Sequence, residues 1–112
     1  MKVAIVGSRD LIINDLEHHL PEDTTEIVSG GARGIDSCAK AFALANGYRY
    51  TEFLPEYEKY GKVAPILRNK DIVNYSDLVI IFWDGESRGS KSVIDFCKKY
   101  KKQYIIKTPK TP

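Results

Sequence analysis

Three short segments of the sequence combine glycine, serine and arginine, the residue types that suit an anion-binding loop. They are Gly7-Ser8-Arg9-Asp10, Ser29-Gly30-Gly31-Ala32-Arg33-Gly34-Ile35-Asp36 and Asp84-Gly85-Glu86-Ser87-Arg88-Gly89-Ser90. Glycine permits a positive φ and lets the main chain approach a ligand without a Cβ in the way. The arginine guanidinium offers a fork of donors that matches a phosphate group. The segments therefore predict contacts with a phosphate-bearing ligand.

Each segment also has a purely structural interpretation. A turn between a strand and a helix can need glycine for geometry alone, and Ser87 or Ser90 can cap a helix as well as bind a phosphate oxygen. Arg68 and Asn69, which fall within a predicted helix, can point toward the same ligand or remain in solvent. Because two glycines, an arginine and a third glycine occur together in residues 30–34, we favour ligand binding at that segment.

Several widespread catalytic and cofactor-binding motifs are absent. The first apolar run is followed by GSRD and not by the dinucleotide fingerprint GxGxxG, and neither GxxxxGK[ST] nor GxSxG occurs. Ordinary NAD oxidoreductases, P-loop NTPases and hydrolases with a serine nucleophile elbow are therefore disfavoured. Asp36, Asp84 and Glu86 are the carboxylates near the expected site, and their spacing identifies no paired acid and base.

The cysteines and histidines suggest neither a metal site nor a redox centre. Cys38 and Cys97 lie far apart without CxxC spacing, and each falls in an apolar helical pattern, so both are expected to be buried thiols. His18 and His19 are adjacent and would point in different directions on a helix. We therefore expect no metal, and no cofactor beyond a nucleotide-type ligand of unknown identity.

Apolar runs and alternating patterns predict five strands. They fall at residues 2–7, 26–29, 48–54, 78–83 and 104–107. The run LVIIFW at 78–83 is the most apolar, as expected for a strand buried on both faces at the centre of a parallel sheet.

Helical patterns occupy the intervals between these strands. One apolar stripe runs from Ile35 to Ala43 and ends at Asn46-Gly47, a second helix runs from Pro65 to about Tyr75, and a third from Ser90 to Tyr100. A further helix, capped by Asp10 and stopped by Pro21, would bury Ile13, Leu16 and Leu20. Residues 55–62, rich in tyrosine and charge, are expected to form a loop.

This alternation predicts a single Rossmann-like α/β domain over residues 1–112, with a doubly wound five-stranded parallel sheet and helices on both faces. The common strand order is 3-2-1-4-5, in which strands 1 and 4 lie side by side where the winding reverses. Ligands of such sheets bind beyond the carboxyl ends of the strands at that reversal. The three glycine-containing segments all follow strands and should meet there.

The composition is that of an ordinary globular protein, with 43% hydrophobic and 29% charged residues in 112. The first apolar stretch, Val3 to Val6, is too short for a signal peptide or a membrane span, so we expect a cytoplasmic protein with no membrane partner. The formal charge of +2 does not by itself indicate nucleic-acid binding.

Lysines are concentrated at the C-terminal end, at Lys98, Lys99, Lys101, Lys102, Lys107 and Lys110. The simpler interpretation is a solvated last helical turn whose lysines complement the helix dipole. The alternative is a binding patch.

The motifs GSRD, SGGARGID, the pair Arg68-Asn69 and FWDGESRGS, in this order, resemble the small YpsA-related branch of the SLOG superfamily from Val3 to about Ile106. That superfamily joins Lonely Guy phosphoribohydrolases, DNA-processing proteins that bind single-stranded DNA, and many proposed nucleotide sensors. The resemblance implies a Rossmann-like fold, a nucleotide-derived ligand at the loop edge and a homodimer.

The sequence departs from the phosphoribohydrolase pattern at one important position. Residues 29–34 are similar to the loop GGGxxG, and Gly89-Ser90 matches the GT of PGGxGTxxE, but Val93 stands where the catalytic glutamate is implied. Asp95 is two positions farther on, roughly 200° around the helix. This departure favours binding over N-glycoside cleavage.

We therefore predict a binding or sensing domain for a nucleotide or nucleotide-derived ligand, with Arg9, Arg33 and Arg88 as anion contacts. One alternative is a hydrolase of a nucleotide N-glycosidic bond or phosphate, using Asp36, Asp84 or Glu86. Another is single-stranded nucleic-acid binding through the same arginines and the C-terminal lysines.

Overall fold

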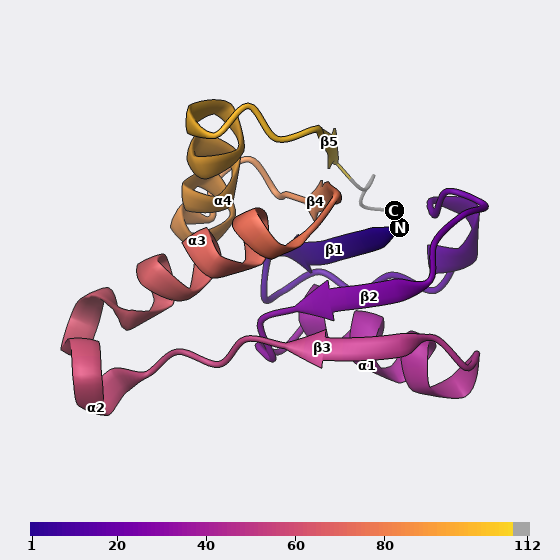
Figure 1. Ribbon diagram of the computed structural model, residues 1–112, viewed down its shortest axis with the longest axis horizontal. Helices are drawn as coiled ribbons and strands as arrows, with labels where there is room; N and C mark the ends of the chain where they lie inside the picture. Colours follow the sequence, from indigo (N-terminus) through magenta and orange to yellow (C-terminus); the bar gives the residue numbers. More distant parts are fainter. Residues whose placement is uncertain (109–112) are drawn as a thin grey trace.

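The computed structural model describes residues 1–108 and is built around one parallel sheet (Figure 1). Its strands are β1 (Lys2–Gly7), β2 (Glu26–Ser29), β3 (Arg49–Glu52), β4 (Leu78–Phe82) and β5 (Tyr104–Lys107), in the order β3-β2-β1-β4-β5. Central β1 pairs with β2 through Val3 and Ile27 and with β4 through Val3 and Leu78. The predicted Rossmann-like, doubly wound α/β fold and its strand order are confirmed.

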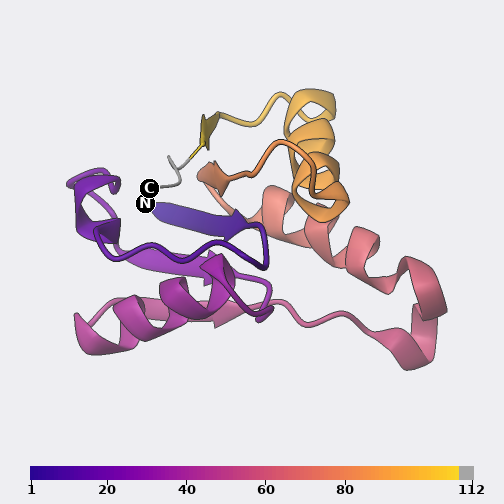
Figure 2. The same ribbon diagram turned by 180° about the vertical axis from the view of Figure 1, so that it is seen from behind.

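Helices cover both faces of the sheet, as predicted (Figures 1 and 2). Helix α1 (Ile35–Ala45) lies on one face, and α3 (Ala64–Tyr75) and α4 (Arg88–Lys99) lie side by side on the other. Because side chains alternate along a strand, β1 contributes to two cores. Val3 and Ile5 pack with α1 in one core, whereas Ala4 and Val6 pack with α3 and α4 in the other.

The connection from β1 to β2 contains no α-helix, so the helix predicted from Asp10 to Leu20 is wrong. One 3-10 turn, η1 (Leu16–His18), is present, and Asp15 precedes it without a side-chain capping bond. Asn14-Asp15 favours turns over helix interiors. This helix was expected to bury three apolar residues. Only Leu16 is buried, and Ile13 and Leu20 are partly exposed.

The segment after β3 is partly helical, where a loop was expected. It forms a one-turn helix, α2 (Tyr57–Tyr60), followed by a 3-10 turn, η2 (Gly61–Val63), and it projects away from the sheet (Figure 1). Pro65 then lies in the first turn of α3, where its missing N–H costs nothing.

Other local predictions are confirmed, with one exception. Asn46 is the C-cap of α1 and Gly47 adopts a φ of 76°, the left-handed conformation that glycine permits. Cys97 is buried, which raises the pKa of its thiol to about 11. Cys38 is only partly buried, because it lies at the margin of the stripe that α1 turns toward the sheet.

No helix within residues 1–108 is long and apolar enough to cross a membrane. In the same part of the chain, no group of three or more His, Cys, Asp or Glu side chains is placed to hold a metal ion.

Candidate functional site

A cavity of about 440 Å3 lies beside the carboxyl ends of β1 and β4, between the first turn of α1 and the helices α3 and α4. The predicted site residues that line it are Gly7, Arg9, Ala32, Arg33, Asp36, Arg68, Asn69, Asp84, Ser87, Gly89 and Ser90. The others, Ser8, Ser29, Gly30, Gly31, Gly34, Gly85 and Arg88, do not line the cavity. The fold thus brings residues from all three glycine-containing segments and both residues of the Arg68-Asn69 pair to one place.

Six lining residues, Val6, Asp10, Pro65, Ile72, Glu86 and Val93, are absent from the predicted ligand-binding residues. Of these, Glu86 was considered only as a carboxylate of a hydrolase, and Val93 only as the replacement of a glutamate. Two of them, Pro65 and Ile72, could have been assigned to the site from the sequence. Pro65 and Ile72 lie three and four positions from Arg68, and residues at that spacing share one face of a helix. If Arg68 faces the site, Pro65 and Ile72 are expected to face it as well.

The Asp36 carboxylate closes the glycine-rich loop after β2. Its Oδ2 accepts hydrogen bonds from the backbone N–H groups of Gly30, at 3.2 Å, and Ala32, at 3.3 Å. Burial raises the pKa of Asp36, while the amide of Ala32 and the charge of Arg68 act in the opposite direction. Two loop amides are therefore occupied by the protein itself. The amides of the first turn of α1 have no intrahelical partner, which is the general feature that makes helix N-termini suit anions.

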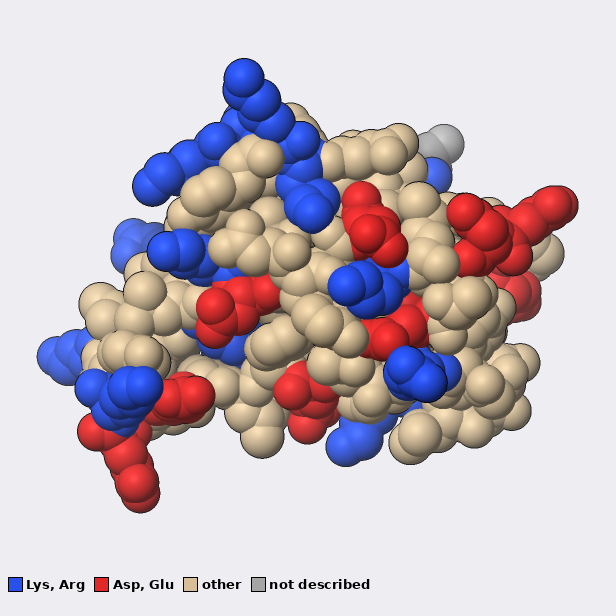
Figure 3. Space-filling model, in the orientation of Figure 1, with Lys and Arg blue, Asp and Glu red and all other residues tan. Residues whose placement is uncertain are grey.

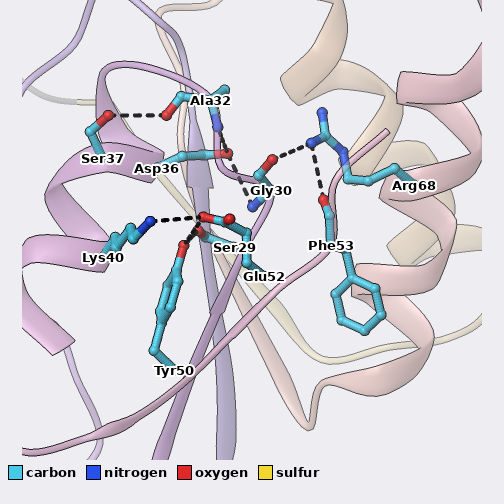
Figure 4. Close-up of polar contacts among 10 residues, drawn as sticks. All are labelled: Ser29, Gly30, Ala32, Asp36, Ser37, Lys40, Tyr50, Glu52, Phe53 and Arg68. Atoms are coloured by element: carbon cyan, nitrogen blue, oxygen red, sulfur yellow. Dashed lines mark hydrogen bonds and ion pairs between the residues drawn. The ribbon is translucent and has the colours of Figure 1, made fainter. Parts of the chain in front are cut away.

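Arg68 joins α3 to that same loop (Figure 4). Its Nη1 donates to the carbonyl oxygens of Gly30, at 2.5 Å, and Phe53, at 3.3 Å, and its Nε donates to Oδ1 of Asn69. Burial lowers the pKa of the guanidinium, and nearby Asp36 acts to raise it. Within the described residues Nη2 makes no hydrogen bond, and no fully buried side-chain nitrogen there lacks a partner, so Nη2 reaches the solvent.

The loops after β1 and β4 are connected by Ser8 and Asp84. The backbone N–H of Asp84 donates to Oγ of buried Ser8 at 3.1 Å, and Oδ1 of Asp84 accepts from the amides of Glu86 and Ser87. These two amides lower the pKa of Asp84, so its carboxylate is ionised at neutral pH. Ser87 in turn caps α4 by accepting from the N–H of Ser90. Ser8 and Ser87 therefore have structural roles.

Ser29 is fully buried and lies apart from the cavity. Its Oγ contacts the hydroxyl of Tyr50 at 2.6 Å, and that hydroxyl donates to Oε1 of Glu52 (Figure 4). Burial is the main cause that raises the pKa of Tyr50. The hydroxyl of Ser29 is thus committed to the structure between β2 and β3.

The three predicted arginine contacts differ in position. Arg9 and Arg33 line the cavity, and Arg33 lies 3.7 Å from a carboxylate oxygen of Asp10, with both side chains largely exposed. Exposed pairs of this kind contribute little to stability, so Arg33 can exchange Asp10 for a ligand. Arg88 is exposed at the start of α4 and does not line the cavity.

The cavity carries charges of both signs. Its three arginines, Arg9, Arg33 and Arg68, face four carboxylates, Asp10, Asp36, Asp84 and Glu86. Because the cations are not in excess, the lining offers both hydrogen-bond donors and charged acceptors. A long polyanion requires a surplus of positive charge.

Val93 lines the cavity, with its side chain almost fully buried, at the position where the phosphoribohydrolase pattern implies glutamate. Asp95 is exposed and forms an ion pair with Lys91 at 3.4 Å. The nearest downstream carboxylate therefore points away from the site, as the helical spacing predicted.

The sheet order and the glycine-rich loop beside its central strand define a Rossmann-like protein of the SLOG superfamily, as predicted. A family model described as DNA recombination-mediator protein A matches residues 1–57, just over half of the chain, and the chain belongs to this family. The match spans β1 to β3, whereas Arg68, Asp84 and Val93 lie beyond it. No curated protein and no solved structure matches the chain.

Proposed function

We propose that the protein binds a nucleotide or nucleotide-derived phosphate ligand in the cavity beside β1 and β4. The observation that carries the proposal is the convergence of three arginines and the first turns of α1 and α4 on one cavity. Helix N-termini favour anions, because their free N–H groups and the helix dipole both point toward the ligand. A volume of about 440 Å3 is within the usual range for small-ligand sites.

The lining side chains suit different parts of such a ligand. Arg9, Arg33 and the free Nη2 of Arg68 offer donors to a phosphate. Asp84 and Glu86 can accept hydrogen bonds from ribose hydroxyls or base amino groups.

Binding without turnover is the favoured form of the proposal. Val93 cannot supply a carboxylate, the Asp84 carboxylate already accepts two backbone hydrogen bonds, and Asp36 is held by its own loop. Glu86 is the remaining carboxylate that a hydrolase would use together with Asp84.

A thermal-shift screen tests the proposal. The purified protein is mixed with nucleoside mono-, di- and triphosphates, nucleotide sugars, cyclic dinucleotides and ADP-ribose derivatives. A true ligand at about 100 times its Kd stabilises the fold by about 2.7 kcal/mol. Chromatography of the same mixtures detects released base or phosphate. Release that Asp84→Asn or Glu86→Gln abolishes would replace the sensor proposal by a hydrolase, and a screen without any stabilising compound would contradict both.

Single-stranded nucleic-acid binding is a second candidate, favoured by the family match to DNA recombination-mediator protein A. Such binding would weaken steeply as salt rises, because each neutralised phosphate releases counterions. Titration of a labelled oligonucleotide at several salt concentrations separates it from the small-ligand proposal.

A homodimer is also proposed, through the projecting segment after β3. Leu54, Tyr57, Tyr60, Val63 and Ile66 are each at least 40% exposed, and such clustered apolar side chains suit a protein contact. Sedimentation of Tyr57→Ser beside the parent protein tests this: a parent that is monomeric at all concentrations would rule it out.

A further inference from the structure

Strand β5 leaves one edge of the sheet open. It is last in the strand order, so β4 is its one neighbour in the described sheet. The carbonyl oxygen of Lys107 faces β4, because it accepts from the N–H of Trp83 at 2.9 Å. Successive residues of a strand point their backbone groups to alternate sides, so the N–H and C=O groups of Tyr104 and Ile106 point to the free edge. They are available to another strand.

The isoleucines of β5 are exposed on opposite faces of the sheet. Ile105 and Ile106 are 39% and 41% exposed. Ile105 pairs with Ile80, which belongs to the core under α1, whereas Ile106 pairs with Ile81, which belongs to the core under α3 and α4. An open edge strand with apolar side chains is the arrangement that invites pairing with another chain.

A second cavity, of about 480 Å3, lies beside the carboxyl end of β5, and we call it the edge cavity. Its apolar lining comes from Ile12, Ile13 and Phe82, and Lys107 also lines it. Ile12 is 74% exposed, because the connection from β1 to β2 forms no helix that would bury it. No residue lines both this cavity and the one beside β1 and β4.

The edge cavity and the free edge can be used together. Lys107 lies two residues after Ile105, so both side chains belong to the face of the sheet that α1 covers elsewhere. A strand paired with β5 would place alternate side chains on this same face, next to the edge cavity. An apolar side chain of that strand could therefore enter it.

Charge at β5 selects among possible occupants. Lys101 precedes the strand, Lys107 ends it, and neither forms an ion pair within residues 1–108. No acidic residue follows Asp95 in the sequence, and Figure 3 shows basic side chains gathered over α4, the helix before β5. A second copy of β5 would bring the same lysines, and like charges opposite each other destabilise a strand pair. An acidic strand would pair with them instead.

From these observations we propose that β5 binds an extended peptide segment of another protein, which adds a sixth strand to the sheet. The segment carries an apolar side chain for the edge cavity and acidic residues toward Lys101 and Lys107. In this mode of recognition the backbone hydrogen bonds supply affinity and the cavity supplies specificity. The proposal does not depend on the ligand of the cavity beside β1 and β4.

The experiment begins with selection of random peptides displayed on phage, using the immobilised 112-residue protein as the target. Peptides of about eight residues are long enough to span the four residues of β5. Enriched sequences should contain an apolar residue flanked by acidic ones. A labelled synthetic copy of an enriched peptide is then titrated by fluorescence anisotropy, and rising salt should weaken its binding.

Ile106→Pro tests the backbone pairing. It removes the N–H that points to the free edge and keeps the hydrogen bonds to β4, because proline is tolerated on an edge strand with its nitrogen toward solvent. The selected peptide should bind at least about fivefold more weakly to this variant. Circular dichroism checks that the variant is folded.

Two further variants test the cavity and the charge, and they carry the test if Ile106→Pro does not fold. Ile12→Ser should weaken the peptide about fivefold, since an apolar contact is lost. The matched control is Ile66→Ser, which removes another exposed isoleucine, on α3, and should leave the affinity unchanged. Lys107→Glu should weaken the acidic peptide about tenfold and shift the selection toward basic sequences.

Three outcomes would overturn the proposal. One is a selection that enriches no peptide, and another is a peptide whose affinity is the same for the parent, Ile12→Ser and Lys107→Glu. The third comes from sedimentation: a dimer of the parent that Ile106→Pro abolishes would assign the free edge to a second copy of the chain.

Discussion

Arg68 donates a hydrogen bond from Nη1 to the carbonyl oxygen of Gly30, a residue 38 positions earlier in the chain. This bond ties helix α3 to the loop after β2 across the wall of the cavity. A Cβ on Gly30 would collide with the same guanidinium group, so a larger residue at this position would displace Arg68 from its hydrogen bond. A residue expected to contact a ligand thus also assembles the site.

Arg68→Ala should destabilise the fold by about 2–6 kcal/mol, because the carbonyl oxygens of Gly30 and Phe53 lose a donor at about 1–3 kcal/mol each. Urea denaturation measures the loss. Arg33→Ala is the matched control, and since its side chain is 75% exposed the change should stay within about 0.5 kcal/mol. Equal effects of the two variants would contradict a structural role for Arg68.

Asp36 should make stability depend on pH. Burial raises its pKa in the folded protein, so the protonated carboxyl favours folding at low pH, and this contribution is lost as pH rises through the raised pKa. The parent should therefore lose stability as pH rises from about 4, whereas Asp36→Asn should not. The unfolding free energy of the variant minus that of the parent should become more positive over this range. A difference between Asp36→Asn and the parent that stays constant across this pH series would show that ionised Asp36 is not penalised by burial.

Gly34→Ala and Gly89→Ala should change stability in opposite directions. Gly34 has a φ of 76°, and an added Cβ would collide with the backbone carbonyl of Arg9, so the substitution should cost at least about 1–2 kcal/mol. Gly89 lies in the first turn of α4 with open space around its Cβ position, and alanine there should stabilise by about 0.4–1 kcal/mol. Thermal unfolding distinguishes the two, and a neutral Gly34→Ala would argue against the loop geometry.

Arg33→Ala should weaken a ligand found in the screen by about tenfold or more, because a charge-assisted hydrogen bond contributes about 1.5–3 kcal/mol. Arg88→Ala, an equal loss of charge outside the cavity, should leave that affinity within about twofold. Isothermal titration calorimetry measures both. The reverse ranking would relocate the ligand to the exposed start of α4.

The arrangement of the sheet could be predicted from the sequence because it depends on patterns that extend over many residues. The run LVIIFW predicted a central strand, and alternation with helical stripes predicted a parallel sheet and its winding. The first crossover could not be predicted, since Ile13, Leu16 and Leu20 have helical spacing while Asn14-Asp15 favours a turn, and tertiary packing decides between them.

The composition of the cavity could be predicted in part. The segments that approach it follow from topology, but which atoms remain free depends on side-chain hydrogen bonds between residues distant in sequence. The Asp36 carboxylate accepts hydrogen bonds from two loop amides, and the Ser29 hydroxyl is hydrogen-bonded to that of Tyr50. Arg88 turns outward although its neighbour Gly89 lines the cavity, because adjacent helical residues point in different directions.

Central strand β1 is the first strand to be synthesised, but one of its two neighbouring strands is synthesised much later. Val3 pairs with Ile27 and then with Leu78, 75 residues after it, and the far wall of the cavity needs α4 as well. At ribosomal speeds of about 5–20 residues per second, roughly 3 to 10 s separate the synthesis of Ile27 on β2 from that of Leu78 on β4. Throughout that interval the apolar run VAIV has one edge unpaired, so the nascent chain is most vulnerable to aggregation at the strand that later lies deepest in the fold.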